Sequence, residues 1–94
     1  MVVGVIRVEI HIHGAGSLKE KRSVVRRIKD RARSRHNVSV AEVDDQHLHQ
    51  RSTLGFAAVG HSEDVLRRLF DTLRDEIENL LPGGVISWEE DILD

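Results

Sequence analysis

Apolar and polar residues alternate at the start of the chain, which is the pattern of a strand with one buried face. From Val2 to His13 the two kinds of side chain lie on opposite sides of an extended backbone. The apolar side carries Ile6, Val8, Ile10 and Ile12, and the polar side carries Arg7, Glu9, His11 and His13. We therefore predict a first strand over this range.

The pattern changes to a helical period after Gly14-Ala15-Gly16. Ser17 is followed three residues later by Glu20, the capping-box spacing that satisfies free N–H groups at a helix start. The predicted apolar face holds Leu18, Val25, Ile28 and Ala32, with Val24 at its margin. Asn37 suits the left-handed conformation that follows many helices. The sequence thus predicts a helix from Ser17 to about Asn37.

Two short strands joined by a polar loop are predicted next. β-Branched and small residues favour a strand from Val38 to Val43, and a similar composition returns from Ser52 to Val59. The stretch between them, from Asp44 to Arg51, is polar and predicts a turn. Together these segments form a hairpin with a long loop.

A second helix and a last strand complete the chain. Ser62 caps the helix, and Pro82-Gly83-Gly84 ends it. Its apolar residues recur at steps of three and four and are Val65, Leu66, Leu69, Phe70, Leu73, Ile77 and Leu80. The last strand runs from Val85 to Leu93, and its predicted apolar side holds Ile86, Trp88 and Ile92.

This order of elements, β-α-β-β-α-β, predicts a ferredoxin-like α+β fold. Four strands then form an antiparallel sheet in the spatial order 4-1-3-2, and both helices cover one face. The length suits a single domain, residues 1–94. The fold brings the end of the first strand, the start of the first helix and the hairpin loop to one edge. The residues expected near that edge are His11, His13, Lys19, Arg22, His47, His49 and Arg51.

Charge is distributed unevenly along the chain. The net charge of the whole is −2, but Ser17 to Asn37 holds nine of the fourteen Lys and Arg residues and only two acids. This segment therefore carries +7 and the remainder −9. Helical spacing places five cations in a stripe on one flank, namely Lys19, Arg22, Arg26, Lys29 and Arg33. A second row holds Arg27, Arg31 and Arg35.

A localised ridge of cations binds phosphates even on a chain of negative net charge. We therefore predict a non-catalytic protein that binds RNA or a ribosomal particle through the stripe and Arg51. Secondary candidates for the same contacts are Lys21, Arg27, Arg31 and Gln50. Base stacking across the sheet is not expected, because the chain has no Tyr, one Trp and two Phe. The competing interpretation is a solvated face on which Asp30 pairs with Arg26, Arg27 and Arg33.

Two other classes of function stay open. The histidines His11, His13, His47 and His49 would hold a metal such as zinc if the fold made them converge. No metal or other cofactor is predicted, because the chain lacks cysteine and any His-Glu-x-x-His motif. An enzyme would use these histidines with an acid, and the candidates are Glu9, Glu42, Asp44 and Asp45. The sheet face without helices would suit a homodimeric protein-interaction module.

The N-terminal apolar run is interrupted by Arg7 and Glu9, too early for a signal peptide or a membrane span. The absence of cysteine gives no indication of an oxidising compartment. We therefore predict a cytoplasmic protein that has no membrane partner.

Three stretches resemble a known family. They are Gly14-Ala15-Gly16-Ser17-Leu18-Lys19-Glu20-Lys21-Arg22-Ser23-Val24-Val25, Asn37-Val38-Ser39-Val40-Ala41-Glu42-Val43-Asp44, and Gln50-Arg51 with Leu54-Gly55. They look like the YlxP-like family of small bacterial proteins of unknown function. The resemblance implies the ferredoxin-like fold and, since family genes commonly lie beside those for translation initiation and ribosome maturation factors, a role linked to RNA. Relatives show Asp-x-Trp-Gln-Arg where this chain has His47-Leu48-His49-Gln50-Arg51, so the resemblance assigns no role to that aromatic residue here.

Overall fold

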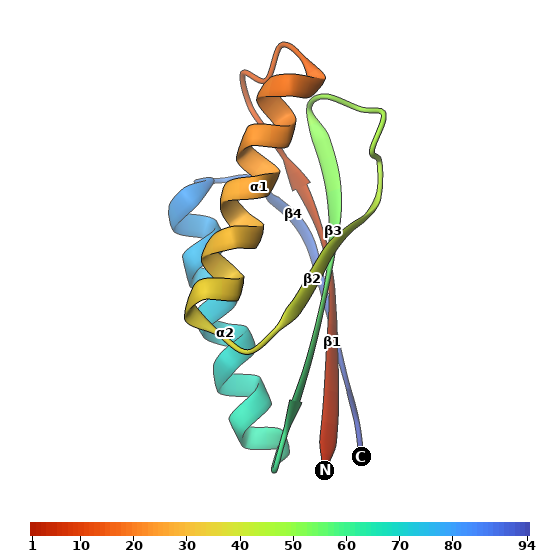
Figure 1. The fold of residues 1–94 in the computed structure, drawn as a ribbon, viewed down its shortest axis with the longest axis vertical. Helices are drawn as coiled ribbons and strands as arrows, with labels where there is room; N and C mark the ends of the chain where they lie inside the picture. The colour runs from red at the N-terminus through yellow and green to blue at the C-terminus, as the bar shows by residue number, and fades with distance from the viewer.

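The alternating and helical segments fold into one sheet and two helices in a computed structural model that describes residues 1–94. The elements are β1 (Val2–His11), α1 (Leu18–Arg35), β2 (Ser39–Asp44), β3 (Arg51–Gly60), α2 (Glu63–Leu80) and β4 (Val85–Leu93). The strands form an antiparallel sheet in the order β2-β3-β1-β4, and both helices cover one face (Figure 1). This is the order 4-1-3-2 read from the other edge, so the predicted fold class is confirmed.

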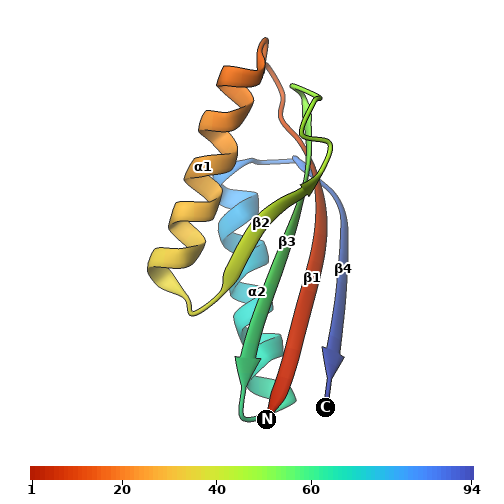
Figure 2. The ribbon, with the colours of Figure 1, turned by 45° about the vertical axis from the view of Figure 1, so that its right-hand side comes forward.

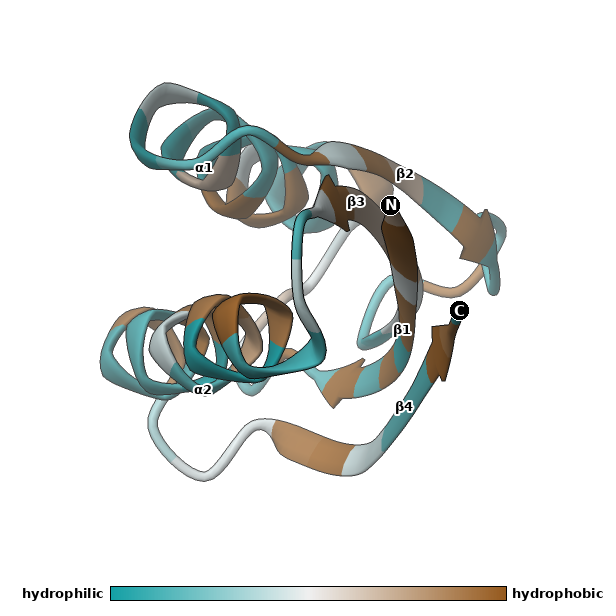
Figure 3. Cartoon of the chain, turned by 90° about the horizontal axis from the view of Figure 1, so that it is seen from below, coloured by the Kyte–Doolittle hydropathy of each residue, from teal (hydrophilic) through white to brown (hydrophobic).

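The alternation of β1 decides which of its residues enter the core. Its buried residues are Val2, Gly4, Ile6, Val8 and Ile10, all at even positions. β3 pairs with β1 so that Phe56 lies opposite Ile6, and the even-numbered residues of β3 therefore lie on the same face as those of β1. Figure 3 shows the apolar strips of both helices turned toward the sheet. Seventeen buried apolar residues form one cluster in this layer.

α2 supplies the largest apolar stripe, as predicted. Its buried residues are Leu66, Phe70, Leu73 and Ile77, while Leu69 and Leu80 are partly buried against them. Val65 departs from the prediction, because 39% of it is exposed. At 100° per residue, Val65 lies more than a quarter turn from the centre of the buried stripe.

Phe70 packs on bare backbone. A Cβ atom added to Gly4 of β1 would lie 2.6 Å from Phe70 Cζ and 3.2 Å from Leu66 Cδ1. Gly4 is therefore required by the close approach of α2 to the central strand.

Both helices begin at the predicted serine caps. Ser17 Oγ accepts a hydrogen bond from the N–H of Glu20 at 3.1 Å, and Ser62 Oγ accepts one from Val65 at 3.3 Å. The Glu20 carboxylate accepts from the N–H of Gly16 at 2.8 Å. The acid thus bonds one residue before the cap, instead of returning to Ser17 as in the usual capping box.

Two local predictions are wrong. Asn37 does not end α1 in a left-handed conformation, because α1 is capped by His36 in extended conformation and the chain runs on directly into β2. The non-glycine residue with positive φ is Asp45, at 63°. Ile86 does not join the buried side of β4, since the β1–β4 register shifts between Glu9 and Ile10 and aligns Val85 with Ile10. Ile86 is consequently 45% exposed.

Candidate nucleic-acid interface

α1 lies beside the edge strand β2 and turns its outer side to solvent (Figure 2). Lys19, Arg22 and Arg26 of the predicted stripe are exposed, and Lys29 is half-buried. Arg33 is exposed but engaged, because its guanidinium donates to the carbonyl of Val40 at 3.1 Å. The stripe is therefore accessible along most of its length, with its C-terminal member bonded to β2.

Few of the cations on α1 have an acidic partner. Carboxylate oxygens lie within 4.0 Å of only three of the nine, in the pairs Lys21–Glu42 at 2.9 Å, Arg33–Asp30 at 4.0 Å and Arg35–Glu76 at 3.7 Å. The other six, which we call the basic face, are Lys19, Arg22, Arg26, Arg27, Lys29 and Arg31. Asp30 therefore pairs with Arg33 alone, and the interpretation in which it also neutralises Arg26 and Arg27 is not supported.

The basic face is centred between the two predicted rows of cations. A shallow hollow on the outer side of α1 is lined by Ser23, Arg26, Arg27, Asp30, Arg31 and Ser34. Arg27 and Arg31, which the sequence ranked as secondary candidates, thus line this hollow together with Arg26 of the stripe. Asp30 is the one acidic residue in this lining.

Lys21, another secondary candidate, is not available to a ligand. It is fully buried, and its Nζ lies 2.9 Å from Glu42 Oε2 and donates to the backbone carbonyl of Asp45. Lys21 lies four residues before Val25 and seven before Ile28, so it occupies the core-facing phase of the helix. This position on the helix is the feature of the sequence that indicates burial of Lys21. The charge of lysine, which is rarely buried, favours an exposed position instead.

The carboxylate that meets Lys21 belongs to a polar network beneath the hairpin loop. Glu42 Oε2 also accepts from Ser52 Oγ at 2.6 Å, and Asp45 Oδ2 accepts from Thr53 Oγ1 at 3.0 Å. Both hydroxyl residues are buried. Every buried polar side-chain atom in the chain has a partner, so this network is complete without a ligand. It fastens the loop to the N-terminal half of α1.

The acids considered for acid–base chemistry are mostly engaged elsewhere. Glu42 and Asp45 belong to the network under the loop. Asp44 accepts from Arg7 at 3.5 Å and from the N–H of Asp45 at 2.8 Å. Glu9 is half-buried in β1. No hydrogen bond joins any of these acids to a histidine, so the structure does not assemble an acid–base pair from them.

The predicted meeting of chain segments at one edge is observed. The N–H of Ile12 donates to the carbonyl of Gln50 at 2.9 Å, and the Gln50 side chain donates to the carbonyl of Ala15 at 3.3 Å. Two of the four histidines meet there, with 3.3 Å between His11 Nδ1 and His13 Nε2. No group of three or more His, Asp or Glu side chains in the chain is placed to hold a metal ion. His47 and His49 therefore do not complete a site with the pair.

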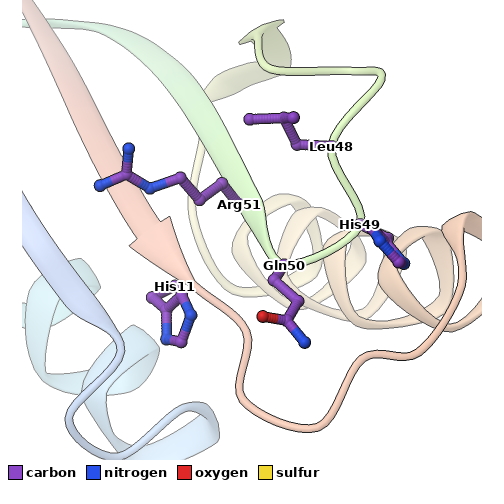
Figure 4. A pocket seen from close by; sticks show the side chains of 5 residues that line it. All are labelled: His11, Leu48, His49, Gln50 and Arg51. Carbon is purple, nitrogen blue, oxygen red and sulfur yellow. The ribbon is translucent and has the colours of Figure 1, made fainter.

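Arg51 lies apart from the basic face. It is exposed at the start of β3 opposite His11, on the sheet face that the helices leave open. Its guanidinium has no carboxylate within 4.0 Å, and Gln50 precedes it in a cleft of about 310 Å³. The lining residues of this cleft are His11, Leu48, His49, Gln50 and Arg51 (Figure 4). Arg51 and Gln50 therefore lie on a different surface from the basic face, and their contact with RNA stays a prediction.

Neither helix combines the length and apolar composition that a membrane span needs. The structure resembles the designed protein LFR1 1 with ferredoxin fold, at a TM-score of 0.61 and 15% identity over 100% of this chain and 87% of the designed one. It also resembles SnoaB, a cofactor-independent oxygenase from Streptomyces nogalater, at a TM-score of 0.58 and 14% identity over 99% and 91%. At such identities the likeness shows the fold alone.

Sequence comparison is more specific. The uncharacterized protein YlxP of Bacillus subtilis (strain 168) is 44% identical over 61 residues, which cover 65% of this chain and 66% of that relative. The aligned part thus spans slightly less than two thirds of the relative. Residues 3–89 match the family described as protein of unknown function DUF503. The chain therefore belongs to DUF503, the YlxP-like family that its Ser-Leu-Lys-Glu-Lys-Arg motif resembles.

Proposed function

We propose that the protein binds the phosphate backbone of structured RNA or of a ribosomal particle through the basic face of α1. The observation that carries the proposal is the set of six cations without an acidic partner on one helix, in a chain of net charge −2. Such a face attracts phosphate oxygens and releases counterions when it binds them. The proposal includes a cytoplasmic location, where an RNA or ribosomal partner would be met.

Solubility alone is a weaker explanation of the basic face. Arg22 with Arg26 and Arg27 with Arg31 are spaced i,i+4, where like charges destabilise a helix. Alternating positive and negative side chains would keep the helix soluble without this repulsion. A bound anion removes the repulsion, so the clustering of positive charges on α1 favours a ligand.

The basic face is also held rigidly. The buried contact of Lys21 with Glu42 fastens the start of α1 to β2. At the other end, His36 Nε2 lies 3.1 Å from Glu76 Oε1 of α2, and Arg35 lies 3.7 Å from the same carboxylate oxygen. From Lys19 to Arg31 the face spans about 18 Å at 1.5 Å per residue, enough to meet several phosphates. Because these contacts address the backbone, we expect little preference for base sequence.

The test is RNA binding by the double variant Arg22→Glu with Arg26→Glu. Both side chains are exposed, so the fold is expected to persist while binding to two unrelated RNA sequences is lost. The single Gln variants should each reduce the slope of log affinity against log salt by about 0.7 on single-stranded RNA. Fluorescence anisotropy and sedimentation with ribosomal subunits over a salt series measure both effects.

The matched control is Arg68→Gln on α2. Arg68 is exposed and, like the basic face, has no carboxylate within 4.0 Å, but it lies among the acids of α2. Its loss should leave RNA affinity unchanged. Equal binding by Arg68→Gln and the double variant, or no binding by the unaltered protein at low salt, would overturn the proposal.

A homodimer formed through the open sheet face is the second candidate. Val5, Val43, Val59 and Leu93 are 39–57% exposed there. Monomeric proteins seldom leave such clusters uncovered. Analytical ultracentrifugation tests it, since Val59→Asp should convert a dimer to a monomer, whereas a protein that sediments as a monomer at high concentration excludes it.

A further inference from the structure

The cleft lined by His11, Leu48, His49, Gln50 and Arg51 has no use in the proposed function, because it lies at the end of the open sheet face. We propose that this cleft binds a phosphate monoester, either on a small metabolite or at the end of a nucleic-acid strand. The proposal goes beyond the basic face and does not depend on it.

The lining of the cleft favours an anion. It contains one guanidinium, two imidazoles, one amide and one leucine side chain, and no carboxylate, although acids outnumber Lys and Arg in the chain by sixteen to fourteen. Arg51 is always charged and presents up to five N–H donors in a fork that matches phosphate oxygens. Since no carboxylate of the chain lies within 4.0 Å of it, these donors have no competing acidic partner.

The donors are held on ordered backbone. His11 and Arg51 are register partners in the β1–β3 ladder, where facing Cβ atoms lie about 5 Å apart. The N–H of His11 is bonded to the carbonyl of Gly84 at 2.7 Å. The carbonyl and the side chain of Gln50 are bonded to Ile12 and Ala15. Figure 4 shows His11 and Arg51 at the end of β1 and the start of β3, with Leu48 and His49 on the loop beside them. The backbone that carries the donors is therefore ordered before a ligand binds.

The same geometry disfavours a metal cation. The 3.3 Å contact between His11 Nδ1 and His13 Nε2 requires one ring to donate to the other, which occupies the lone pair of the acceptor nitrogen. Each ring keeps a second nitrogen outside this bond, but a cation there would stand beside the fixed positive charge of Arg51 and would find no third His, Asp or Glu side chain to complete its ligands. When His13 is the donor, the proton of His11 is on Nε2, which then donates to a phosphate while the bond between the rings stays intact.

The size of the cleft limits the ligand. Its volume of about 310 Å³ lies at the lower end of small-molecule sites, which leaves room for one phosphate and a small organic part. Leu48 supplies an apolar surface for that part. A monoester carries more negative charge than the diester of a continuous backbone, so this cationic cleft favours terminal or free phosphates.

The test uses four probes: inorganic phosphate, a nucleoside 5′-monophosphate, and a short oligonucleotide with either a 5′-phosphate or a 5′-hydroxyl. We expect the phosphorylated probes to shift the NMR signals of the His11 and His49 imidazoles and the Arg51 side chain. Arg51→Gln should weaken their binding at least tenfold, and His11→Gln serves as the second variant if Arg51→Gln does not fold. Arg68→Gln should have no effect.

The two sources of phosphate give different results. A strand end predicts that the 5′-phosphorylated oligonucleotide binds at least tenfold more tightly than its hydroxyl form, and a small metabolite predicts saturation by the mononucleotide alone. Whichever binding is seen must persist in the variant Arg22→Glu with Arg26→Glu, because this variant alters the basic face and leaves the cleft unchanged. No signal change with any phosphorylated probe, or affinity unaltered by Arg51→Gln and His11→Gln, would overturn the proposal.

Discussion

The two helices share a length, a cap and a sheet face, but differ in what their charged residues do. Both are 18 residues long. Each begins after a serine whose hydroxyl accepts a hydrogen bond from the N–H of the residue three positions later. On α2, Arg67 lies 2.8 Å from Glu63, and this hydrogen bond raises the pKa of Arg67. Arg74 lies 3.4 Å from Glu78 and stacks 5.4 Å from the ring of Trp88. On α1 most cations have no such partner.

The two helices therefore differ in what they bury and in how their charged side chains are paired. α2 buries four large apolar side chains and pairs most of its arginines locally. α1 buries four residues at the same spacing, but they are smaller apolar side chains and a lysine, and most cations on its outer side have no acidic partner. We infer that α2 mainly stabilises the core while α1 presents a surface.

The largest effect is expected from Lys21→Ala, because it leaves Glu42 without its cation in a mostly buried site. Breaking a buried pair in this way costs about 3–5 kcal/mol of unfolding free energy. Denaturant unfolding measures the loss. The double variant Lys21→Met with Glu42→Leu should recover part of it, since an apolar pair replaces both charges but leaves the buried Ser52 hydroxyl and the Asp45 carbonyl without these partners. A loss below about 0.5 kcal/mol for Lys21→Ala, which is the range of ordinary surface substitutions, would show that the network is dispensable.

Leu73→Ala tests the core role of α2. Leu73 is 1% exposed, and its truncation should lower the unfolding free energy by about 2–5 kcal/mol through lost burial and a residual cavity. Val65→Ala is the control on the same helix, because Val65 is 39% exposed and should matter far less. Similar losses for the two variants would mean that the assigned buried face is misplaced.

Gly4→Ala tests the contact between α2 and the central strand. The added methyl group meets Phe70 Cζ at 2.6 Å, so the ring must shift. We expect a loss of about 1–3 kcal/mol, typical of overpacking. Chemical denaturation measures it, and Phe70→Leu in the same chain should relieve part of the loss. An unchanged midpoint would indicate that α2 approaches β1 less closely.

The smallest effect compares one arginine from each helix. Arg26→Gln on α1 should raise the melting temperature at low salt, since it removes like-charge repulsion with Arg22. Arg67→Gln on α2 should lower it, because the pair with Glu63 is lost. Both differences should shrink in high salt, which screens exposed charges. Shifts of the same sign in thermal melts would contradict the electrostatic contrast.

Much of the fold follows from periodicity. The alternation from Ile6 to Ile12 and the spacing from Leu66 to Ile77 each require one buried face, and both faces are buried as predicted. Periodicity does not predict the register between strands. The register shift between Glu9 and Ile10 pairs Val85, and not Ile86, with Ile10. This shift depends on how two strands far apart in the sequence align.

The candidate site was less predictable for a different reason. Helical spacing identified the cations of α1, but whether Asp30 pairs with Arg26 or with Arg33 depends on rotamers that sequence does not specify. Lys21 has the helical phase of a core residue, but its charge predicts an exposed position. Arg51 occupies an odd position in β3, and strand parity alone would have placed it on the open face.

The hydrogen bond from Arg33 to the carbonyl of Val40 has a consequence that needs no ligand. β2 is an edge strand, and the unpaired backbone groups of an edge are a template on which a strand of another molecule can pair. The side chain of Arg33 lies along the outer edge of β2, and its guanidinium occupies one backbone acceptor there, the carbonyl of Val40. A second chain approaching β2 would have to displace that side chain and tolerate its charge. We therefore infer that Arg33 disfavours the pairing of another strand with β2.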